Sequence, residues 1–519
     1  MSEGSGAPRR SRAGDGRRPD RRDAQGRQRG AARAEGRGTR SAAAPSQRSR
    51  RGDVPRTVAL ETLRAVADSD AYANLVLPPL LRQRRLQGRD AAFATELTYG
   101  TLRLRGRYDA VLAQVVDRGL DRLDPVVLDV LRLGAHQLLG MRVPVHAAVS
   151  ETVALTREQV GAGAAQLVNA VLRRVSERPL AQWLQRIGDA ADPGVTDRTA
   201  RLAVVESHPA WVARAFREAL VGHGRSADEL EPLLQADNRA PAVTLAARPG
   251  LVSVAELADG GLDLTPGALA GTAAVLRAGD PGDVPAVRDG RAGVQDEGSQ
   301  LVTLALAAAP LDGPDERWLD LAAGPGGKAA LLGALAAERG ARLVANEVHA
   351  HRAELVRQSL RAVPSSAVEE VRVGDGRDVG EREPGSYDRV LLDAPCTGLG
   401  ALRRRPESRW RRTPADLATL GELQRGLLAS ALAAVRPGGV VGYVTCSPHL
   451  AETTLVVTDA LRAAARAGTS AQVVDARAVV LGLVPDGAPV PELPDRPQVQ
   501  LWPHVHGTDA MHLTLLRRD

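Results

Sequence analysis

Between residues 317 and 445, the apolar residues of this chain gather in short runs that alternate with stretches of helical periodicity. The runs span 317–323, 341–347, 369–374, 388–393 and 439–445. Strand-length runs separated by helical patterns predict an α/β domain whose parallel sheet is covered by helices on both faces. Ligands bind such a sheet at the carboxyl ends of its strands. Chemistry is therefore expected directly after each run, in a domain that we predict to span residues 291–519.

Residues 53–177 have a different pattern, with apolar positions at helical spacing throughout. Asp124 as N-cap, Pro125 in the first turn and Gly140 at the end bound one helix. Its apolar stripe consists of Val127, Leu131, Ala135 and Leu138. A second helix carries its stripe at Leu167, Val168, Val171, Leu172 and Val175. No catalytic constellation occurs in this all-helical segment, and packing or capping is expected of Tyr99, His136 and His146.

Residues 178–290 mix short helical patterns with strand-like runs such as 241–247, broken by turns rich in glycine and proline. This mixture predicts a small α+β connecting module between the helical domain and the α/β domain.

The first 52 residues form an arginine-rich segment with few apolar side chains. Fifteen arginines against five acids give it a net charge of +10, which leaves 6 − 10 = −4 for the rest of the chain. Such a segment cannot bury enough apolar surface to offset chain entropy, so we expect a disordered tail. It can bind phosphates without sequence preference, or act only as a solubilising tail.

With 519 residues, the chain has room for about three domains. Its two cysteines exclude a disulfide framework and any zinc site built from three or four cysteines. No apolar run is long enough for a membrane span. We expect a cytoplasmic monomer that binds neither metal nor membrane.

A glycine-rich loop follows the first strand run and leads into a helix predicted for 329–338. The loop is not a P-loop, because Ala322 stands at its first glycine position and Ala329 follows its lysine. It fits the dinucleotide pattern G-x-G-x-x-A at Gly324, Gly326 and Ala329. Glu347, twenty residues after Gly327, ends the next strand run, where a carboxylate meets ribose hydroxyls. These features indicate an adenosine cofactor, either a dinucleotide or S-adenosylmethionine.

Lys328, which ends this loop, is the single lysine among 68 basic residues. A compact ammonium on a flexible stem is not interchangeable with a planar guanidinium. We therefore expect the site to need a lysine at this position.

The two cysteines lie just beyond strand ends in the same domain, although fifty residues separate them in sequence. Cys396 lies in Asp393-Ala-Pro-Cys-Thr, and Cys446 in Thr445-Cys-Ser-Pro. Asp375 likewise follows a strand run. Most free cysteines are small buried hydrophobes, but two at one predicted ligand edge favour a chemical role.

This chain resembles the RsmB/NOL1/NOP2/Sun family of RNA cytosine-5 methyltransferases in the Asp393–Cys396 and Thr445–Ser447 segments and in the loop Pro325-Gly-Gly-Lys328. The N-terminal part resembles the helical RNA-binding domain of the antitermination factor NusB in residues 72–76, 93–103 and 168–174. Together these likenesses cover most of residues 53–519 and are typical of members that act on small-subunit (16S) ribosomal RNA.

The resemblance implies a class I, Rossmann-like methyltransferase domain that binds S-adenosylmethionine. Its implied cofactor residues are Ala322, Ala323, Gly324, Pro325, Gly326, Gly327, Lys328, Glu347, Asp375 and Asp393. Three positions depart from the family pattern: Ala322 stands where cysteine is common, Glu347 where aspartate is common, and His512 where an aromatic residue is usual. Ala322 can act through its backbone, and Glu347 through its carboxylate. The departure at His512 concerns a packing contact or a contact with the edge of the base.

Methylation at carbon 5 of cytosine needs a nucleophile that adds to carbon 6, and a thiolate suits both this addition and its later departure. A second group must then assist loss of the C5 proton and release of the thiol. The residues alone do not assign these roles to Cys396 and Cys446. The resemblance implies that Cys446 attacks and that Cys396 serves product release. We expect Asp393 to hold the N3/N4 edge of the base.

Residues 402–412 contain six arginines and Trp410. Their position favours an RNA-backbone clamp over an ordinary solvated loop, with Trp410 as a stacking platform or a core anchor. The main reading is an RNA cytosine-5 methyltransferase. The alternatives are a non-catalytic RNA-binding or ribosome-assembly protein that retains a cofactor fold, and an NAD-dependent oxidoreductase.

Overall fold

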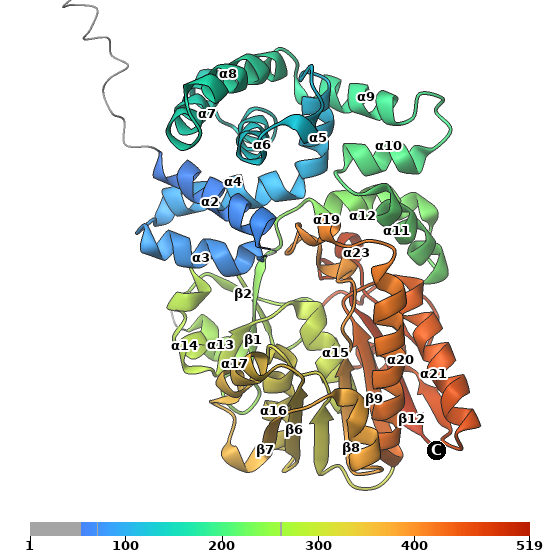
Figure 1. Ribbon diagram of the computed structural model, residues 1–519. Coiled ribbons are helices and arrows are strands. Elements are labelled where there is room, and N and C mark those ends of the chain that lie inside the picture. The colour runs from blue at the N-terminus through green and yellow to red at the C-terminus, as the bar shows by residue number, and fades with distance from the viewer. Residues whose placement is uncertain (1–52, 70, 260–261) are drawn as a thin grey trace, which may run out of the picture. The chain divides into compact units, whose positions relative to one another are not determined.

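The computed structural model describes residues 53–69, 71–259 and 262–519 (Figure 1). The tail predicted at residues 1–52 lies outside the described residues. The N-terminal part is all-helical, as predicted. Its helices are α2 (Val54–Asp68), α3 (Ala73–Gln83), α4 (Gly88–Arg103), α5 (Arg105–Ala113), α6 (Pro125–Leu139), α7 (Val145–Gln159) and α8 (Ala162–Ser176).

Helix α6 shows how the sequence sets these elements. The Asp124 carboxylate accepts hydrogen bonds from the backbone N–H groups of Val126 and Val127, which have no partner inside the helix. The predicted stripe faces the core, because Val127, Leu131 and Ala135 are buried. His136 packs inside, where its Nδ1 lies 2.7 Å from the Tyr108 hydroxyl. Both the predicted helix and the packing role of His136 are confirmed.

The next segment contains four helices and then a small antiparallel sheet. The helices are α9 (Leu180–Ala191), α10 (Arg198–Val205), α11 (Ala210–Gly222) and α12 (Leu230–Asp237). The sheet has the order β2-β3-β1-β4, formed by β1 (Val243–Ala247), β2 (Leu264–Pro266), β3 (Ala273–Leu276) and β4 (Ala292–Val294), with α13 (Val254–Ala258) and α14 (Pro285–Asp289) between strands. Trp183 and Ile187 of α9 pack into the core of the N-terminal helices.

The C-terminal part is built on an eight-stranded sheet with the order β10-β12-β9-β8-β5-β6-β7, and β11 pairs with β12. Its strands are β5 (Arg317–Asp320), β6 (Arg342–Glu347), β7 (Val368–Val373), β8 (Tyr387–Asp393), β9 (Val435–Thr445), β10 (Ala471–Val474), β11 (Val499–Gln500) and β12 (His512–Arg518). Strands β5 to β9 pair in parallel, at all five predicted positions. The predicted parallel sheet is confirmed for these five strands, and strands outside the predicted runs extend it antiparallel, β12 beside β9 and β10 beside β12.

Helices cover both faces of this sheet (Figure 1). Neighbouring strand residues alternate between two cores: Trp318 belongs to one and Leu319 to the other, as do Val440 and Val441. The first core includes α15 (Glu297–Ala308), α16 (Gly327–Glu338), α17 (Ala350–Leu360) and α22 (Ala476–Leu481); the second includes α18 (Val379–Arg382), α20 (Asp416–Ala434) and α21 (Thr454–Arg466). The described residues of the C-terminal part also contain two short helices, α19 (Ser408–Arg411) and α23 (Pro503–His506).

Within the described ranges, no helix is both long and apolar enough to cross a membrane.

Candidate active site

The glycine loop connects β5 to α16, which begins two residues before the predicted start. Gly326 has φ +111°, and a Cβ there would lie 2.6 Å from the Ser359 side chain, so this turn requires glycine. Gly327 differs, because the nearest atom to an added Cβ is Gln295 Cδ at 3.9 Å. The loop therefore packs tightly on one side and borders open space beside Gln295.

Glu347, at the end of β6, lies against this loop. One of its carboxylate oxygens accepts a hydrogen bond from the Gly324 N–H at 3.0 Å, and the other accepts one from the His349 N–H at 3.0 Å. Arg352 lies 3.6 Å from the carboxylate. Only 3% of Glu347 is exposed, so its carboxylate is part of the wall of the loop.

Asp375 follows β7 at the same carboxyl edge of the sheet. Its carboxylate accepts a hydrogen bond from the Arg377 N–H at 2.9 Å and forms an ion pair with the Arg377 guanidinium at 2.6 Å. Both contacts with Arg377 lower the pKa of Asp375. Asp375 is thus ionised and half-exposed, and its described partner, Arg377, belongs to the same turn.

Lys328 reaches across from α16 to the end of β8, where its ammonium lies 2.8 Å from an oxygen of Asp393. Burial alone would lower the pKa of Lys328, but Asp393 and the nearby Cys446 raise it, so the ammonium stays charged. Buried Asp320 lies close enough to interact with both partners, and burial, followed by Asp393, raises its pKa to about 8. The single lysine thus offsets negative charge within a cluster of acids.

The two thiols meet in space, with Cys396 Sγ 3.4 Å from Cys446 Sγ. Their electrostatic surroundings differ. Hydrogen bonding to the other thiol, helped by Lys328 and Arg405, lowers the pKa of Cys446. The same contact, burial and the carboxylate of Glu452 raise the pKa of Cys396. These surroundings favour ionisation of Cys446 over ionisation of Cys396, although either sulfur can be the donor in their contact.

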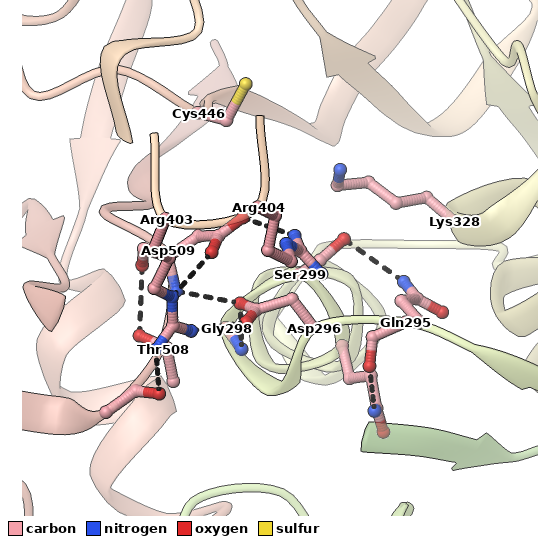
Figure 2. A network of polar contacts seen from close by, with 12 residues as sticks. Gln295, Asp296, Gly298, Ser299, Lys328, Arg403, Arg404, Cys446, Thr508 and Asp509 are labelled. Atoms are coloured by element: carbon pink, nitrogen blue, oxygen red, sulfur yellow. Dashed lines mark hydrogen bonds and ion pairs between the residues drawn. The ribbon is translucent and has the colours of Figure 1, made fainter. Parts of the chain in front are cut away.

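A network of arginines and acids borders Cys446 (Figure 2). Arg403 Nε donates to Asp509 at 3.0 Å, its Nη2 to Asp296 at 2.9 Å and its Nη1 to the Gly507 carbonyl at 2.7 Å. Arg404 pairs with the other oxygen of Asp509 and interacts electrostatically with Cys446. This network holds three distant segments of chain around the thiol.

The predicted RNA clamp at residues 402–412 is wrong for most of its arginines, because they bond inside the protein. Arg403 has the internal partners described above, and Arg411 Nη2 donates to the Val66 and Ala71 carbonyls. Arg409 is fully buried and donates to the carbonyls of Arg103 and Asp237. Only Arg405 is exposed.

Trp410 and His512 are both packing residues. A Cβ on Gly106 of α5 would overlap the Trp410 ring, and the Arg105 guanidinium lies 5.8 Å from the centre of that ring. This geometry favours a core anchor over a stacking platform. His512 is fully buried, its Nε2 lies 2.9 Å from Thr514 Oγ1, and its ring contacts those of His223 and Tyr443.

Several residues of the site were not predicted from the sequence. They are Gln295, Asp296, Asp320, Arg404, Glu452 and Asp509. Asp320 lies in the middle of the predicted run 317–323, but the observed strand β5 ends at this residue, which places it at the ligand edge of the sheet. Arg404 lies in the 402–412 segment, for which an RNA clamp was predicted, and Glu452 follows Cys446 by six residues. Gln295, Asp296 and Asp509 lie far from the predicted motifs in sequence and reach the site only through folding.

The residues present fit S-adenosylmethionine. The open space beside Gly327 leaves room for a ligand at the start of α16, and the carboxylates of Glu347 and Asp393, which contact the loop at Gly324 and Lys328, supply negative charge that suits a sulfonium cation. No group of three or more His, Cys, Asp or Glu side chains that could hold a metal occurs in the described part of the chain.

Comparison with known proteins decides the family. The model of the 16S rRNA methyltransferase RsmB/F family matches residues 306–517, and that of the NusB family matches residues 53–177. Ribosomal RNA small subunit methyltransferase B of Pseudomonas putida is 32% identical over 411 residues, which cover 78% of this chain and 88% of that protein. The chain belongs to the RsmB/F family of 16S rRNA methyltransferases.

Two further matches extend over nearly all of this RsmB/F family methyltransferase. The Mycobacterium tuberculosis protein Rv1407, which carries the name methyltransferase, is 52% identical over 471 residues, covering 91% of this chain and 98% of that protein. The crystal structure of PH0851 has the same fold, with a TM-score of 0.69 and 21% identity, and covers 90% of this chain and 98% of that one. Both the expected fold class and the family resemblance are confirmed.

Proposed function

We propose that this protein transfers a methyl group from S-adenosylmethionine to carbon 5 of a cytosine in small-subunit ribosomal RNA, through a covalent bond between Cys446 and carbon 6. The observation that carries the proposal is the pair of thiols 3.4 Å apart beside the Lys328–Asp393 ion pair. An ionised thiol next to a protonated one is the arrangement that addition to and release from a pyrimidine ring require.

In the first step, Cys446 Sγ adds to carbon 6 of the cytosine, and the electron pair of the C5–C6 double bond becomes available at carbon 5. We assign Asp393 to the N3/N4 edge of the base; the Lys328 ammonium, 2.8 Å from its carboxylate, supports this role by fixing that carboxylate. When bound, the cofactor supplies an electrophilic methyl group, which carbon 5 attacks.

In the second step, the proton on carbon 5 leaves to a base or a water molecule. Its bonding electrons restore the C5–C6 double bond and break the bond between carbon 6 and Cys446 Sγ. Cys396 supports this release, because its S–H can donate to the departing sulfur at 3.4 Å. Loss of Cys396 should therefore slow release more than attack.

The cofactor is held by the loop from Ala322 to Lys328, together with Glu347, Asp375 and Asp393. The loop offers the backbone N–H groups at the start of α16, and the acids offer carboxylates to the ribose and to the cationic part of the ligand. A dinucleotide remains the competing ligand for the loop pattern. Isothermal titration calorimetry with each compound should give binding of S-adenosylmethionine and none of NAD.

We assign RNA binding to residues 53–177, the part that matches the NusB family. Residues 178–290 act as the connecting module, and residues 291–519 act as the methyltransferase domain. The base that reacts must leave its stack to reach the thiols, so an unpaired or loop cytosine is the expected target.

Bisulfite sequencing of 16S rRNA tests the proposal. A strain that lacks the gene should lose protection at one cytosine, and the gene should restore it. The Cys446→Ser variant, expressed at the same level, should not. Restoration by this variant would favour a non-catalytic role in ribosome assembly, and unchanged protection in the deletion strain would contradict the proposed reaction.

A further inference from the structure

Glu452 is a buried acid next to the thiol pair that the reaction scheme above leaves without a role. It lies in the short helix Leu450–Glu452 after β9 and is 0% exposed. Its carboxylate accepts hydrogen bonds from Thr397 N–H at 2.7 Å, from the Thr397 hydroxyl, and from Gln424 Nε2 at 3.2 Å. No cation among the described residues forms an ion pair with it. A buried charge without a counter-ion is costly to keep, which points to a function.

The hydrogen bonds to the Glu452 carboxylate all converge on the segment that carries Cys396. Thr397 directly follows this cysteine, and Gln424, which also bonds Glu452, donates to the Pro395 carbonyl at 2.7 Å. The carboxylate therefore fixes the residues on both sides of Cys396. It also places a negative charge beside that thiol.

The charges around the two sulfurs are arranged asymmetrically. Those facing the pair are Glu452 after β9, Asp393 at the end of β8, Lys328 on α16, and Arg404 and Arg405 after the Cys396 segment; Tyr443 of β9 is also near. Asp393 acts on both thiols. Lys328 and Arg405 lower the pKa of Cys446, whereas Glu452 raises the pKa of Cys396.

We propose that Glu452 is a positioning residue that decides which thiol attacks: it fixes the Cys396 segment and keeps the shared proton on Cys396, so that Cys446 is the sulfur that ionises. This proposal rests on the assignment of Cys446 as the nucleophile. Two acidic groups in hydrogen-bond contact share one proton, and a fixed charge beside one of them determines where the proton stays.

The test is the pH dependence of thiol alkylation in the full chain, with iodoacetamide as the probe and mass spectrometry to quantify each cysteine peptide. Only the thiolate reacts, so the pH midpoint of the rate reports ionisation of each sulfur. In a Cys446→Ser background, Glu452→Gln should lower the Cys396 midpoint by about one pH unit, which is about a tenfold faster reaction at pH 7. In a Cys396→Ser background, the same change should move the Cys446 midpoint much less.

Two control variants separate charge from structure. Glu422→Gln removes an exposed carboxylate from α20 and should leave both midpoints unchanged. Thr397→Val removes one hydrogen bond but keeps the charge of Glu452, so the Cys396 midpoint should stay or rise. This second variant keeps the proposal testable if Glu452→Gln does not fold, because a fall in the midpoint would then refute it.

An unchanged Cys396 midpoint in Glu452→Gln, or equal shifts of both thiols, would also overturn the role of Glu452. The measurement uses neither RNA nor methyl donor. A normal alkylation result with no methylated cytosine would therefore count against the proposed reaction alone, and the reverse result against Glu452 alone.

Discussion

Single residues at this site act mainly through their charge and through the length of their side chains, and less through the shape of those side chains. Lys328 offsets Asp393, Glu452 faces Cys396, and Arg405 favours a thiolate at Cys446. In a buried site such contacts are only weakly screened by water, so removing one charge changes the chemistry of its neighbours.

The two cysteines should differ in what their loss leaves behind. Cys446→Ala cannot form the bond to carbon 6, so it should be inactive and should never retain RNA on a denaturing gel. Cys396→Ala can still attack and methylate but is slow to release, so it should accumulate a covalent protein–RNA complex. The double variant is the control and should trap no RNA. Trapping by Cys446→Ala and not by Cys396→Ala would mean that the roles are reversed.

Glu347→Ala and Asp375→Ala should weaken S-adenosylmethionine binding while leaving the fold intact. Each lost charge-assisted hydrogen bond should cost about 1.5–3 kcal/mol, which calorimetry would record as roughly a tenfold to hundredfold rise in Kd. Glu370→Ala, an exposed acid on β7, is the matched control and should bind as the wild type does. If both site variants kept wild-type affinity, these acids would lie outside the cofactor site.

Asp320 predicts a pH dependence of stability. Burial, followed by Asp393, raises its pKa from 3.8 to about 8, so the folded state holds a proton that the unfolded state releases. Stability should therefore fall as pH rises from about 4 to 8, at up to about 1.4 kcal/mol per pH unit. Asp320→Asn stays neutral, so its Tm should exceed that of the wild type by a margin that grows over this range. The exposed Asp459→Asn should show no such trend.

At the scale of elements, the segment between β8 and α20 links distant helices to the active site. Arg103 Nε donates to the Arg403 carbonyl at 3.2 Å, Ala73 N–H donates to Glu407 at 3.2 Å, and Arg409 donates to four groups on three different stretches of chain. Arg403, Arg409 and Arg411 of this segment are therefore internal cross-links. The same segment carries Arg404 and Arg405 to the thiols.

Arg409→Ala should lower the free energy of unfolding by about 3–5 kcal/mol, because it leaves several buried carbonyl groups without a donor. Urea unfolding followed by circular dichroism would measure this loss. Arg412→Ala is the control from the same segment, because its side chain is 33% exposed and lies 3.9 Å from Asp416, and it should change stability by about 0.5 kcal/mol or less. Similar values for the two variants would show that Arg409 does not cross-link the segment.

At the scale of the whole molecule, the charge is divided between a tail of +10 and a remainder of −4. An RNA substrate is attracted to the first and repelled by the second. The tail should therefore contribute to encounter with RNA at low salt, where screening is weak.

Removal of residues 1–52 should reduce RNA affinity mainly at low salt and flatten the dependence of log Kd on log salt. The turnover rate at saturating RNA should stay the same, since the thiols, the loop and the acids all lie in the C-terminal part. Filter binding across a salt series and single-turnover kinetics would measure the two effects. A large loss of turnover at saturation would show that the tail takes part in more than binding.

The sequence by itself determined the local elements. Short apolar runs between helical patterns predicted β5 to β9, the Asp124 cap and Pro125 predicted α6, and the glycines predicted the loop before α16. These features depend on backbone preferences and on side-chain periodicity within a few neighbouring residues, which the sequence shows directly.

Only the tertiary structure decided which distant groups meet. It paired Cys396 with Cys446 at 3.4 Å, placed Glu452 behind Thr397, and inserted β12 antiparallel beside β9. It also gave most arginines of the predicted clamp hydrogen-bond partners inside the protein. The physical reason is that an arginine has the same local preferences on a surface as in a core. Whether it meets RNA or a buried carbonyl depends on packing between segments tens to hundreds of residues apart.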